Sequence, residues 1–319
     1  EAMFTGFAYG FRPGRSQHDA LDALAEAIHR KVSWVLDADI RSFFDTIDHG
    51  WMQQFLEHRI GDRRMVRLLM KWMRAGVMEQ GELRETREGT PQGGIISPLL
   101  ANIYLHYALD LWVKSWRKKH ARGELYFVRY ADDFVMAFRY EEDARAMHVA
   151  LAARLAKFGL ELHPDKTRVL RFGRYAREQA ARDGRKPETF DFLGFTHISG
   201  RNRDGRFQLK RKTSREKRGA KLAALRKQMR WRMHHPVKRQ WAWLQSVLRG
   251  HFRYYAVPTN YGALAGFRRG VRDAWHRALQ RRSQRARWSV EKLLRFDERH
   301  PLPVPKILHP WPEVRFADP

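Results

Sequence analysis

Two apolar, aromatic segments, residues 125–130 and 134–138, flank the sequence Tyr130-Ala131-Asp132-Asp133. Segments of this kind, joined by so short a connection, predict a β-hairpin with two adjacent carboxylates at its tip. Like charges this close raise a pKa unless a cation neutralises them, and Mg²⁺ is the natural partner because it binds carboxylate oxygens. Taken alone, the pair is more simply interpreted as an Asp-rich turn, since Asp favours turns.

A second acidic segment favours a metal site over a simple Asp-rich turn. Residues 34–40 form an apolar stretch that predicts a strand, and its Asp37 and Asp39 lie two residues apart, on one face. Buried strand acids are costly without partners. If Asp39 lies beside Asp132 and Asp133, the three carboxylates can hold two Mg²⁺ ions about 3.5–4 Å apart for phosphoryl or nucleotidyl transfer.

Composition indicates the class of partner. The 319 residues include 62 Lys+Arg and 35 Asp+Glu, so the formal net charge is +27. A field this positive favours a polyanion, with nucleic acid the leading candidate and an anionic membrane surface the alternative. Cys is absent, which excludes disulfides, Cys-ligated zinc and thiol nucleophiles. No apolar run approaches the roughly 18 residues of a membrane span, and the first residues lack a signal-peptide pattern.

The composition also changes along the chain. Residues 1–200 carry periodic apolar segments with acids interspersed, and residues 201–239 hold a dense run of Lys and Arg with only two acids. Aromatic residues and arginines mix in residues 240–300. Residues 301–319 are rich in proline, which predicts an extended tail.

The basic run predicts a nucleic-acid surface. Its Lys and Arg side chains, with Lys210, Arg211 and Lys217 among them, have aromatic neighbours between 231 and 255 on which bases could stack. A solvated charged face is the alternative, and the aromatic residues fit a helical core equally well. From Arg215 onward the pattern is mostly helical.

Apolar periodicity predicts the remaining elements. Helices are predicted at 16–30, 62–73, 97–116 and 141–158, and strands at 34–40, 125–130, 134–138, 160–162, 168–172 and 190–198. Residues 173–189 are predicted to be a polar loop or insertion. Ser16 is a predicted N-cap, and Asp45 and Asp48 are predicted to lie in a turn or to cap a helix that begins near His49.

Five segments together carry a family resemblance. They are residues 9–16 (YGFRPGRS), 37–45 (DADIRSFFD), 89–102 (GTPQGGIISPLLAN), 130–133 (YADD) and 192–195 (FLGF). Their sequence, order and spacing resemble the reverse transcriptases encoded by bacterial group II introns, over about residues 4–200. Residues 248–255 are similar to the maturase-specific domain of that family.

The resemblance implies an α+β fold of the right-hand polymerase type. Residues 1–200 would form partial fingers and a palm with an antiparallel sheet, residues 201–300 a mostly α-helical thumb and maturase domain, and residues 301–319 a Pro-rich tail. The implied activity is that of an RNA-directed DNA polymerase, which transfers deoxynucleotides to a primer 3′-hydroxyl with two Mg²⁺ ions, or Mn²⁺ in their place. Intron RNA, a DNA primer or target, roles in splicing and mobility, and a bacterial cytoplasmic location without membrane association are also implied.

Residue by residue, the resemblance makes three acids the catalytic metal ligands. These are Asp39, Asp132 and Asp133, and Ile40 joins them in the metal site beside Asp39. Asp37 matches no ligand of the family as clearly. We interpret it as a residue that lies beside the metal ligands and does not bind the metal itself.

The resemblance also places residues at the incoming nucleotide. Phe44 corresponds to an aromatic residue that lies beside the sugar and excludes a 2′-hydroxyl, with Phe43 as the alternative. Either ring could instead be a core residue. Gln92 and Gly93 correspond to residues that contact the nucleotide, and glycine there lets the backbone approach closely.

Three cations complete the predicted site. Lys166 falls where polymerases carry a lysine near the pyrophosphate, either to protonate the leaving group or to offset its charge. Arg12 and Arg15 are predicted to contact the template or the triphosphate. Residues 192–195 resemble the family's primer grip.

The sequence departs from the family in two ways. It begins at Glu1, near the family's second motif, which suggests a fragment, and no Cys/His nuclease segment follows the thumb-like region. These departures keep alternatives open: a splicing maturase that binds intron RNA without polymerising, or a reverse transcriptase of another bacterial type. A viral RNA-dependent RNA polymerase fits less well, because Ala131 stands where those enzymes usually have Gly.

Overall fold

The chain forms two compact units. The computed structural model describes residues 3–74, 77–79, 82–84, 89, 94–282 and 289–312, and at 77–79, 82–84 and 290 it describes the backbone alone. The first unit is Glu1–Leu193 with Ser199–Leu209, and the second is Gly194–Ile198 with Lys210–Pro319. Within the described residues, no helix has the length and apolar character needed to cross a membrane.

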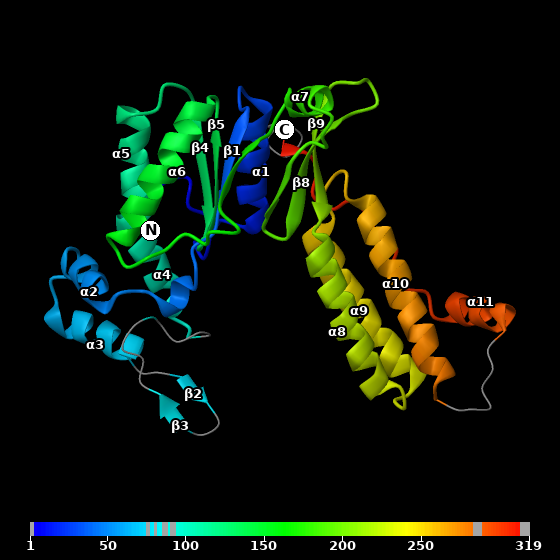
Figure 1. Ribbon diagram of the computed structural model, residues 1–319. Coiled ribbons are helices and arrows are strands. Elements are labelled where there is room, and N and C mark those ends of the chain that lie inside the picture. Colours follow the sequence, from blue (N-terminus) through cyan, green and yellow to red (C-terminus); the bar gives the residue numbers. More distant parts are fainter. Residues whose placement is uncertain are drawn as a thin grey trace. The chain divides into compact units, whose positions relative to one another are not determined.

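A four-stranded antiparallel sheet is the centre of the first unit (Figure 1). In spatial order its strands are β4 (Leu125–Tyr130), β5 (Asp133–Phe138), β1 (Trp34–Ala38) and β6 (Arg168–Arg171). Strands β4 and β5 form the predicted hairpin, with Tyr130 paired to Asp133. Ala38 of β1 pairs with Phe134 of β5, so the same register places the next residue, Asp39, opposite Asp133.

Helices cover both faces of this sheet (Figure 1). α1 (Gln17–His29) lies on one face, and α5 (Leu111–Lys119) and α6 (Glu141–Ala156) lie on the other. Side chains that alternate along β1 and β5, such as Leu36 and Met136, are fully buried with the apolar side of α6. α1 begins after the predicted N-cap Ser16, which forms a capping box with Asp19.

A continuous helical segment leads to α5. It consists of α4 (Ser97–Leu105) and the π-helical turn η2 (His106–Asp110), which continues directly into α5. The predicted helix at 97–116 is therefore present, with a local widening that the sequence pattern did not indicate. π-Helical turns of this kind are often found at functional sites.

Shorter elements complete the first unit. They are the 3₁₀ turn η1 (Phe43–Asp45), α2 (His49–Glu57), α3 (Arg63–Arg74), β2 (Val77–Glu79), β3 (Glu82–Arg84) and α7 (Ala176–Arg182). Of the two acids predicted to lie in a turn or to cap this helix, Asp45 ends the turn η1 and Asp48 caps α2, through a hydrogen bond from Trp51 N. α7 lies inside the predicted polar loop at 173–189, because its strong helix formers carry no apolar stripe that would have revealed it. The predicted strand at 160–162 is only a single bridge between Leu162 and Ile40.

Residues 189–213, where the chain passes from the first unit to the second, form a three-stranded sheet. It contains β7 (Thr189–Phe192), β8 (Phe195–Arg201) and β9 (Phe207–Thr213), in that order. The single strand predicted at 190–198 is thus two strands, separated by Leu193 and Gly194, which both have positive φ. β9 was not predicted, because lysine and arginine hide its alternation of buried Leu209, Arg211 and Thr213 with more exposed neighbours.

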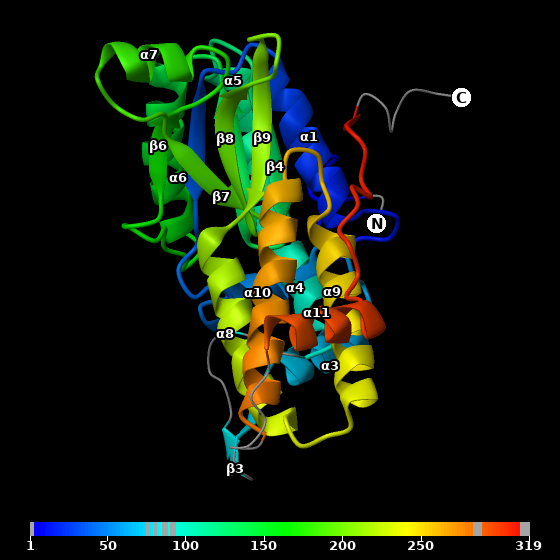
Figure 2. The same ribbon diagram turned by 90° about the vertical axis from the view of Figure 1, so that its right-hand side faces the viewer.

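The second unit is mainly helical, as the pattern from Arg215 onward predicts. Its helices are α8 (Arg215–Arg232), α9 (Val237–Tyr255), α10 (Tyr261–Gln280) and α11 (Val290–Arg299). α8, α9 and α10 run alongside one another in both views (Figures 1 and 2). Their core includes Leu225, Leu248 and Trp275. The predicted α+β class is confirmed, whereas the assignment of palm, thumb and tail to particular residues stays a prediction.

The proline-rich segment 301–312 is extended, as predicted, and it is attached to the second unit. The amides of Leu308 and His309 donate to the carbonyl oxygen of Ala256 at 2.9 and 3.1 Å. The guanidinium group of Arg268 donates to the carbonyl oxygens of Leu302 and Pro303.

Candidate active site

Three carboxylates lie at one end of the central sheet. Asp39 directly follows β1, Asp132 lies in the β4–β5 turn, and Asp133 is the first residue of β5. Ala131 occupies the turn with φ of 56°, a left-handed conformation that costs a residue with a Cβ atom roughly 1–2 kcal/mol. The turn is therefore a strained structure that its surroundings have to hold in place.

Burial is the main influence on two of these acids. The pKa of Asp133 is raised to about 7, mainly by burial and to a smaller extent by the charges of Asp132, Asp37 and Asp39, against an opposing hydrogen bond from Leu193 N at 3.2 Å. Burial also raises the pKa of Asp132, with a smaller contribution from Asp39. The sequence predicted repulsion between neighbours as the cause, and the structure corrects this, because burial contributes more.

Lys166, predicted to lie near the pyrophosphate, contacts one acid of this cluster in the structure. Its Nζ donates to Asp39 Oδ2 at 2.9 Å, and both side chains are substantially exposed. The turn that carries Lys166 is attached to the end of β1, because His163 N donates to the carbonyl oxygen of Asp39 at 2.8 Å and Asp39 N donates to Thr167 Oγ1 at 3.4 Å. An exposed ion pair of this kind contributes little to the free energy of unfolding. Its importance is that it places the positive charge of Lys166 beside Asp39.

Asp37 lies behind the cluster, on the same face of β1. Its side chain is 19% exposed, and Arg168 Nε lies 3.8 Å from its Oδ2. Burial raises the pKa of Asp37 to about 6, and Asp191 and Asp39 add to the increase against Arg168. Asp37 therefore adds negative charge to the site without lying at its exposed end.

The donor chemistry of the site suits a hard divalent cation. Asp39, Asp132 and Asp133 offer carboxylate oxygens, and Ile40, whose side chain is buried and apolar, could offer only its backbone carbonyl oxygen. Acids whose ionisation is opposed by burial and by one another gain from a cation, and Lys166 already forms an ion pair with Asp39. Within the described ranges, no three acidic or histidine side chains are already gathered at metal-binding distances.

The two candidate aromatic residues for sugar contact differ in exposure. Phe43 is 2% exposed and belongs to the core, while the ring of Phe44 is half-buried and meets Phe43 edge to face at 5.3 Å. Phe44 thus retains free surface and Phe43 does not. Gln92 and Gly93 lie outside the described residues.

Gly89, at the start of the 89–102 motif, is described, and it contacts the segment that carries Phe44. Its amide donates to Ile47 O at 2.9 Å, and His49 Nε2 lies 2.6 Å from its carbonyl oxygen. Its φ of 83° and its position, where a Cβ atom would come 2.7 Å from Phe44 O, both require glycine.

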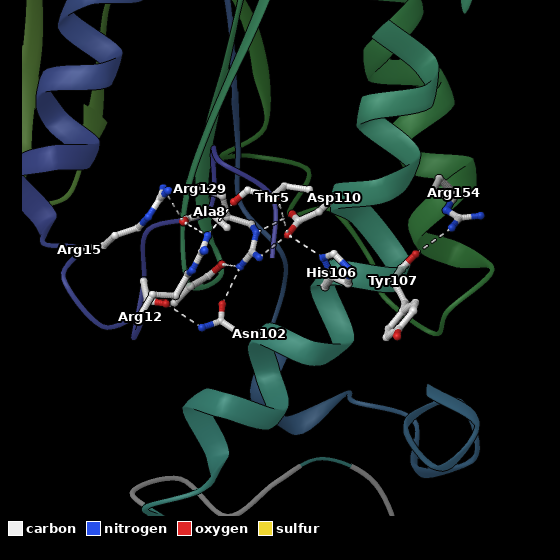
Figure 3. Close-up of polar contacts among 12 residues, drawn as sticks. Thr5, Ala8, Arg12, Arg15, Asn102, His106, Tyr107, Asp110, Arg129 and Arg154 are labelled. Carbon is white, nitrogen blue, oxygen red and sulfur yellow. Dashed lines mark hydrogen bonds and ion pairs between the residues drawn. The ribbon is translucent and has the colours of Figure 1, made fainter. Parts of the chain in front are cut away.

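A buried arginine holds the hairpin that carries the two aspartates (Figure 3). Arg129 of β4 is fully buried and makes a bidentate pair with Asp110, at 2.8 and 2.6 Å. Its third nitrogen donates to Asn102 Oδ1 at 2.9 Å and to the carbonyl oxygen of Ala131 at 2.8 Å. Burial alone would raise the pKa of Asp110, but Arg129 and His106 together outweigh it and the pKa is lowered. The strained turn is thus anchored directly to a buried ion pair.

The 9–16 motif packs on the same turn. Asn102 Nδ2 donates to Gly10 O at 2.7 Å, and a Cβ atom on Gly10 would come 2.3 Å from Ala131 N. Arg12 is 9% exposed and donates to the carbonyl oxygens of Thr5 and Ala8 at 2.6 and 2.8 Å (Figure 3). Arg12 therefore supports this loop in the structure, and its predicted contact with template or nucleotide gains no support from these bonds.

Arg15 also bonds to this loop. Its guanidinium group donates to the carbonyl oxygens of Gly6 and Ala8 and lies over the ring of Tyr9. As for Arg12, a role in binding template stays a prediction.

Comparison with known proteins identifies the family. The family model described as "Reverse transcriptase (RNA-dependent DNA polymerase)" matches residues 2–197. The chain belongs to the reverse transcriptase family. The predicted relationship to proteins encoded by group II introns is also confirmed, by the relatives that follow.

Two curated relatives and one solved structure illustrate the similarity of this reverse transcriptase. Protein YkfC of Escherichia coli is 31% identical over 242 residues, which are 66% of this chain and 59% of that protein. Group II intron-encoded protein LtrA of Lactococcus lactis is 41% identical over 122 residues, 38% of this chain and 20% of that protein. This chain therefore spans less than two thirds of either relative. A telomerase structure from Candida albicans aligns over 86% of this chain and 48% of its own, at 13% identity and a TM-score of 0.47, which is too low to carry an argument.

The residues around Arg129 are the part of the reverse transcriptase site that the sequence did not predict. A signal was present, because Asn102, His106 and Asp110 interrupt an otherwise apolar helical segment at intervals of four residues. Such spacing places polar groups on one face of a buried helix, and buried polar groups require partners. The partner, Arg129, could not be identified from spacing alone.

Proposed function

We propose that this reverse transcriptase is an RNA-directed DNA polymerase whose chemistry takes place at Asp39, Asp132 and Asp133. One observation carries the proposal: three acids lie at one end of a sheet, where burial raises the pKa of two of them. Acids in this state gain from a divalent cation, whereas a protein that only bound RNA would gain nothing from acids facing phosphates.

Two Mg²⁺ ions, or Mn²⁺ in their place, held by these carboxylates and the Ile40 carbonyl oxygen would supply the Lewis-acid chemistry of nucleotidyl transfer. The chain's own residues arrange the reactants. We assign Lys166 to the leaving pyrophosphate, where its charge offsets the developing negative charge or its proton passes to the leaving oxygen. The exposed part of Phe44 lies beside the sugar in this proposal and excludes a 2′-hydroxyl. Gln92 and Gly93 contact the incoming nucleotide.

The proposed partners are an RNA template, a DNA primer or target, and deoxynucleotides. The formal charge of +27 supports nucleic acid, and many of the basic side chains are exposed along α8. The similarity to group II intron-encoded protein LtrA supports intron RNA as a further partner, with roles in splicing and mobility. A cytoplasmic location is part of the same proposal.

Primer extension tests the proposal. The purified chain is given an RNA template annealed to a DNA primer, with Mg²⁺ and deoxynucleotides, beside the variants Asp132→Ala and Asp165→Ala. The second variant is the matched control, because it removes an exposed carboxylate from the nearby turn. We expect extension by the parent and the control, and a loss of more than about a thousandfold in Asp132→Ala.

Other results would change the conclusion. Extension by Asp132→Ala at the parent rate would refute the carboxylate site. No extension by any of the three proteins, with tight RNA binding retained, would favour a maturase without polymerase activity.

A further inference from the structure

A groove in the second unit is lined almost entirely by arginine. It lies between α8 and α10 and has a volume of about 320 Å³. Arg226 and Arg230 come from α8, and Arg277 and Arg281 come from α10. Two alanines of α10, Ala274 and Ala278, complete the lining.

The spacing of these residues explains how they converge. Each pair is four residues apart on its helix, so its two side chains lie one above the other on a single face. The two alanines are also four residues apart on α10, and their small side chains leave room in the groove. Each helix thus presents a row of two guanidinium groups to the same space.

This arrangement does not stabilise the second unit by itself. Like charges at a spacing of four residues destabilise a helix, and two such rows face one groove. Among the described residues, none of the four guanidinium groups has an ion pair with a carboxylate; Arg277 Nε donates to a backbone oxygen, that of Asp273, at 3.1 Å. The side chains of all four arginines are exposed. A bound polyanion would neutralise the charges of these four guanidinium groups.

We infer that this groove is a discrete binding site for the phosphodiester backbone of a nucleic acid strand, separate from the carboxylate site. The inference rests on the proposed function, because it requires a nucleic acid partner, and it adds where that partner is held. Two rows of guanidinium groups suit a chain of phosphates, since each fork can make two parallel hydrogen bonds to phosphate oxygens. Trp231, which follows Arg230 in the chain, is 72% exposed and offers a surface on which a base can stack.

The test compares the groove with an equal change of charge elsewhere in the second unit. The groove variants are Arg226→Gln/Arg230→Gln, Arg277→Gln/Arg281→Gln and the combination of all four. The control is Lys292→Gln/Arg295→Gln on α11, which removes two exposed charges that lie outside the basic run and do not line the groove. The affinity of each protein for a labelled single-stranded RNA of mixed sequence is measured over a salt series, and thermal unfolding confirms that each variant folds.

We expect each groove pair to weaken RNA binding about tenfold and to reduce the salt slope by about 1.4, the value for two phosphates on a single strand. The control should weaken binding less than about threefold. Because both pairs hold one strand, the four-residue variant should lose clearly less than the product of the two separate losses. Arg226→Lys/Arg230→Lys should keep the salt slope and still lose affinity, since lysine retains the charge and not the fork.

Three results would overturn the inference. Equal losses in the groove variants and the α11 control, strictly multiplicative losses between the two pairs, or full affinity in the Arg→Lys variant would each indicate a diffuse basic surface. If any of these occurred while the parent still extended a primer, the groove would be refuted and the proposed function retained. If the parent neither bound RNA nor extended a primer, both would fail.

Discussion

The two units bury ionisable groups of opposite kinds. In the first unit, burial raises the pKa of Asp133 to about 7 and that of Asp37 to about 6. In the second, burial lowers the pKa of His197 to about 3 and that of His251 to about 4, with help from nearby cations. Removal from water thus has opposite consequences in the two units. The buried acids of the first unit ionise more easily beside a cation, and the buried histidines of the second unit resist protonation.

The exposed charges follow the same division. Acids lie at one end of the first unit's sheet, where a cation can join them, while the described lining of the groove in the second unit consists of four arginines and two alanines. If both proposals hold, catalysis and polyanion binding depend on different parts of the chain. Changes in one unit should therefore leave the characteristic property of the other intact.

The largest effect is expected from Arg129→Met in the first unit. It would leave the fully buried Asp110 without its partner, which costs about 3–5 kcal/mol, and would release the carbonyl oxygen of Ala131 at the strained turn. We expect a lower unfolding temperature and loss of primer extension. The double variant Arg129→Met/Asp110→Leu should recover much of the stability and not the activity, because the turn remains without its anchor. Full activity in that double variant would contradict the positioning role of Arg129.

A smaller effect is expected from Lys166→Ala. Loss of a general acid at the leaving group lowers a rate by about a hundredfold, and the exposed pair with Asp39 contributes little to stability. Single-turnover nucleotide incorporation should fall while unfolding temperature and RNA affinity stay the same. Lys166→Arg separates the two roles, because it recovers the rate only if charge suffices. An unaltered rate in Lys166→Ala would remove this residue from the mechanism.

Acid should affect the two units in opposite directions. The folded-state pKa values of His197 and His251 lie below the ordinary value of about 6.5, so the second unit loses stability as pH falls, by about 2 kcal/mol per histidine between pH 6.5 and 5. The raised pKa of Asp133 has the reverse sign: without metal, the first unit gains stability as pH falls through about 7.

Hydrogen exchange followed by mass spectrometry resolves this prediction, because peptides report on each unit separately. His251→Phe, which keeps a ring stacked on Phe267, should reduce the acid sensitivity of the second unit. Equal changes in the stability of both units with pH would contradict this prediction.

Local patterns predicted much of the fold and of the site. The strand with Asp39 and the hairpin with Asp132 and Asp133 could be predicted because apolar runs ending at acids are visible within a few residues of sequence. The capping by Ser16 and Asp48 has the same local origin.

The features that the sequence did not predict depend on residues far apart in the chain, or on residue types that are unusual in the structure they adopt. Arg129 gains its role from Asp110, which lies 19 residues away on a different element. Arg211, predicted to face RNA, is 1% exposed because it belongs to the buried side of β9. The turn at Leu193 and Gly194 was missed because Leu is an unusual residue at positive φ.

The most direct test of this division is the RNA affinity of Asp132→Ala, measured under the conditions in which its primer extension is lost. The account predicts a dissociation constant for single-stranded RNA within about twofold of the parent value and the same salt slope, because the proposed phosphate-binding groove lies in the other unit. Loss of RNA affinity in step with loss of extension, in a variant that remains folded, would contradict it.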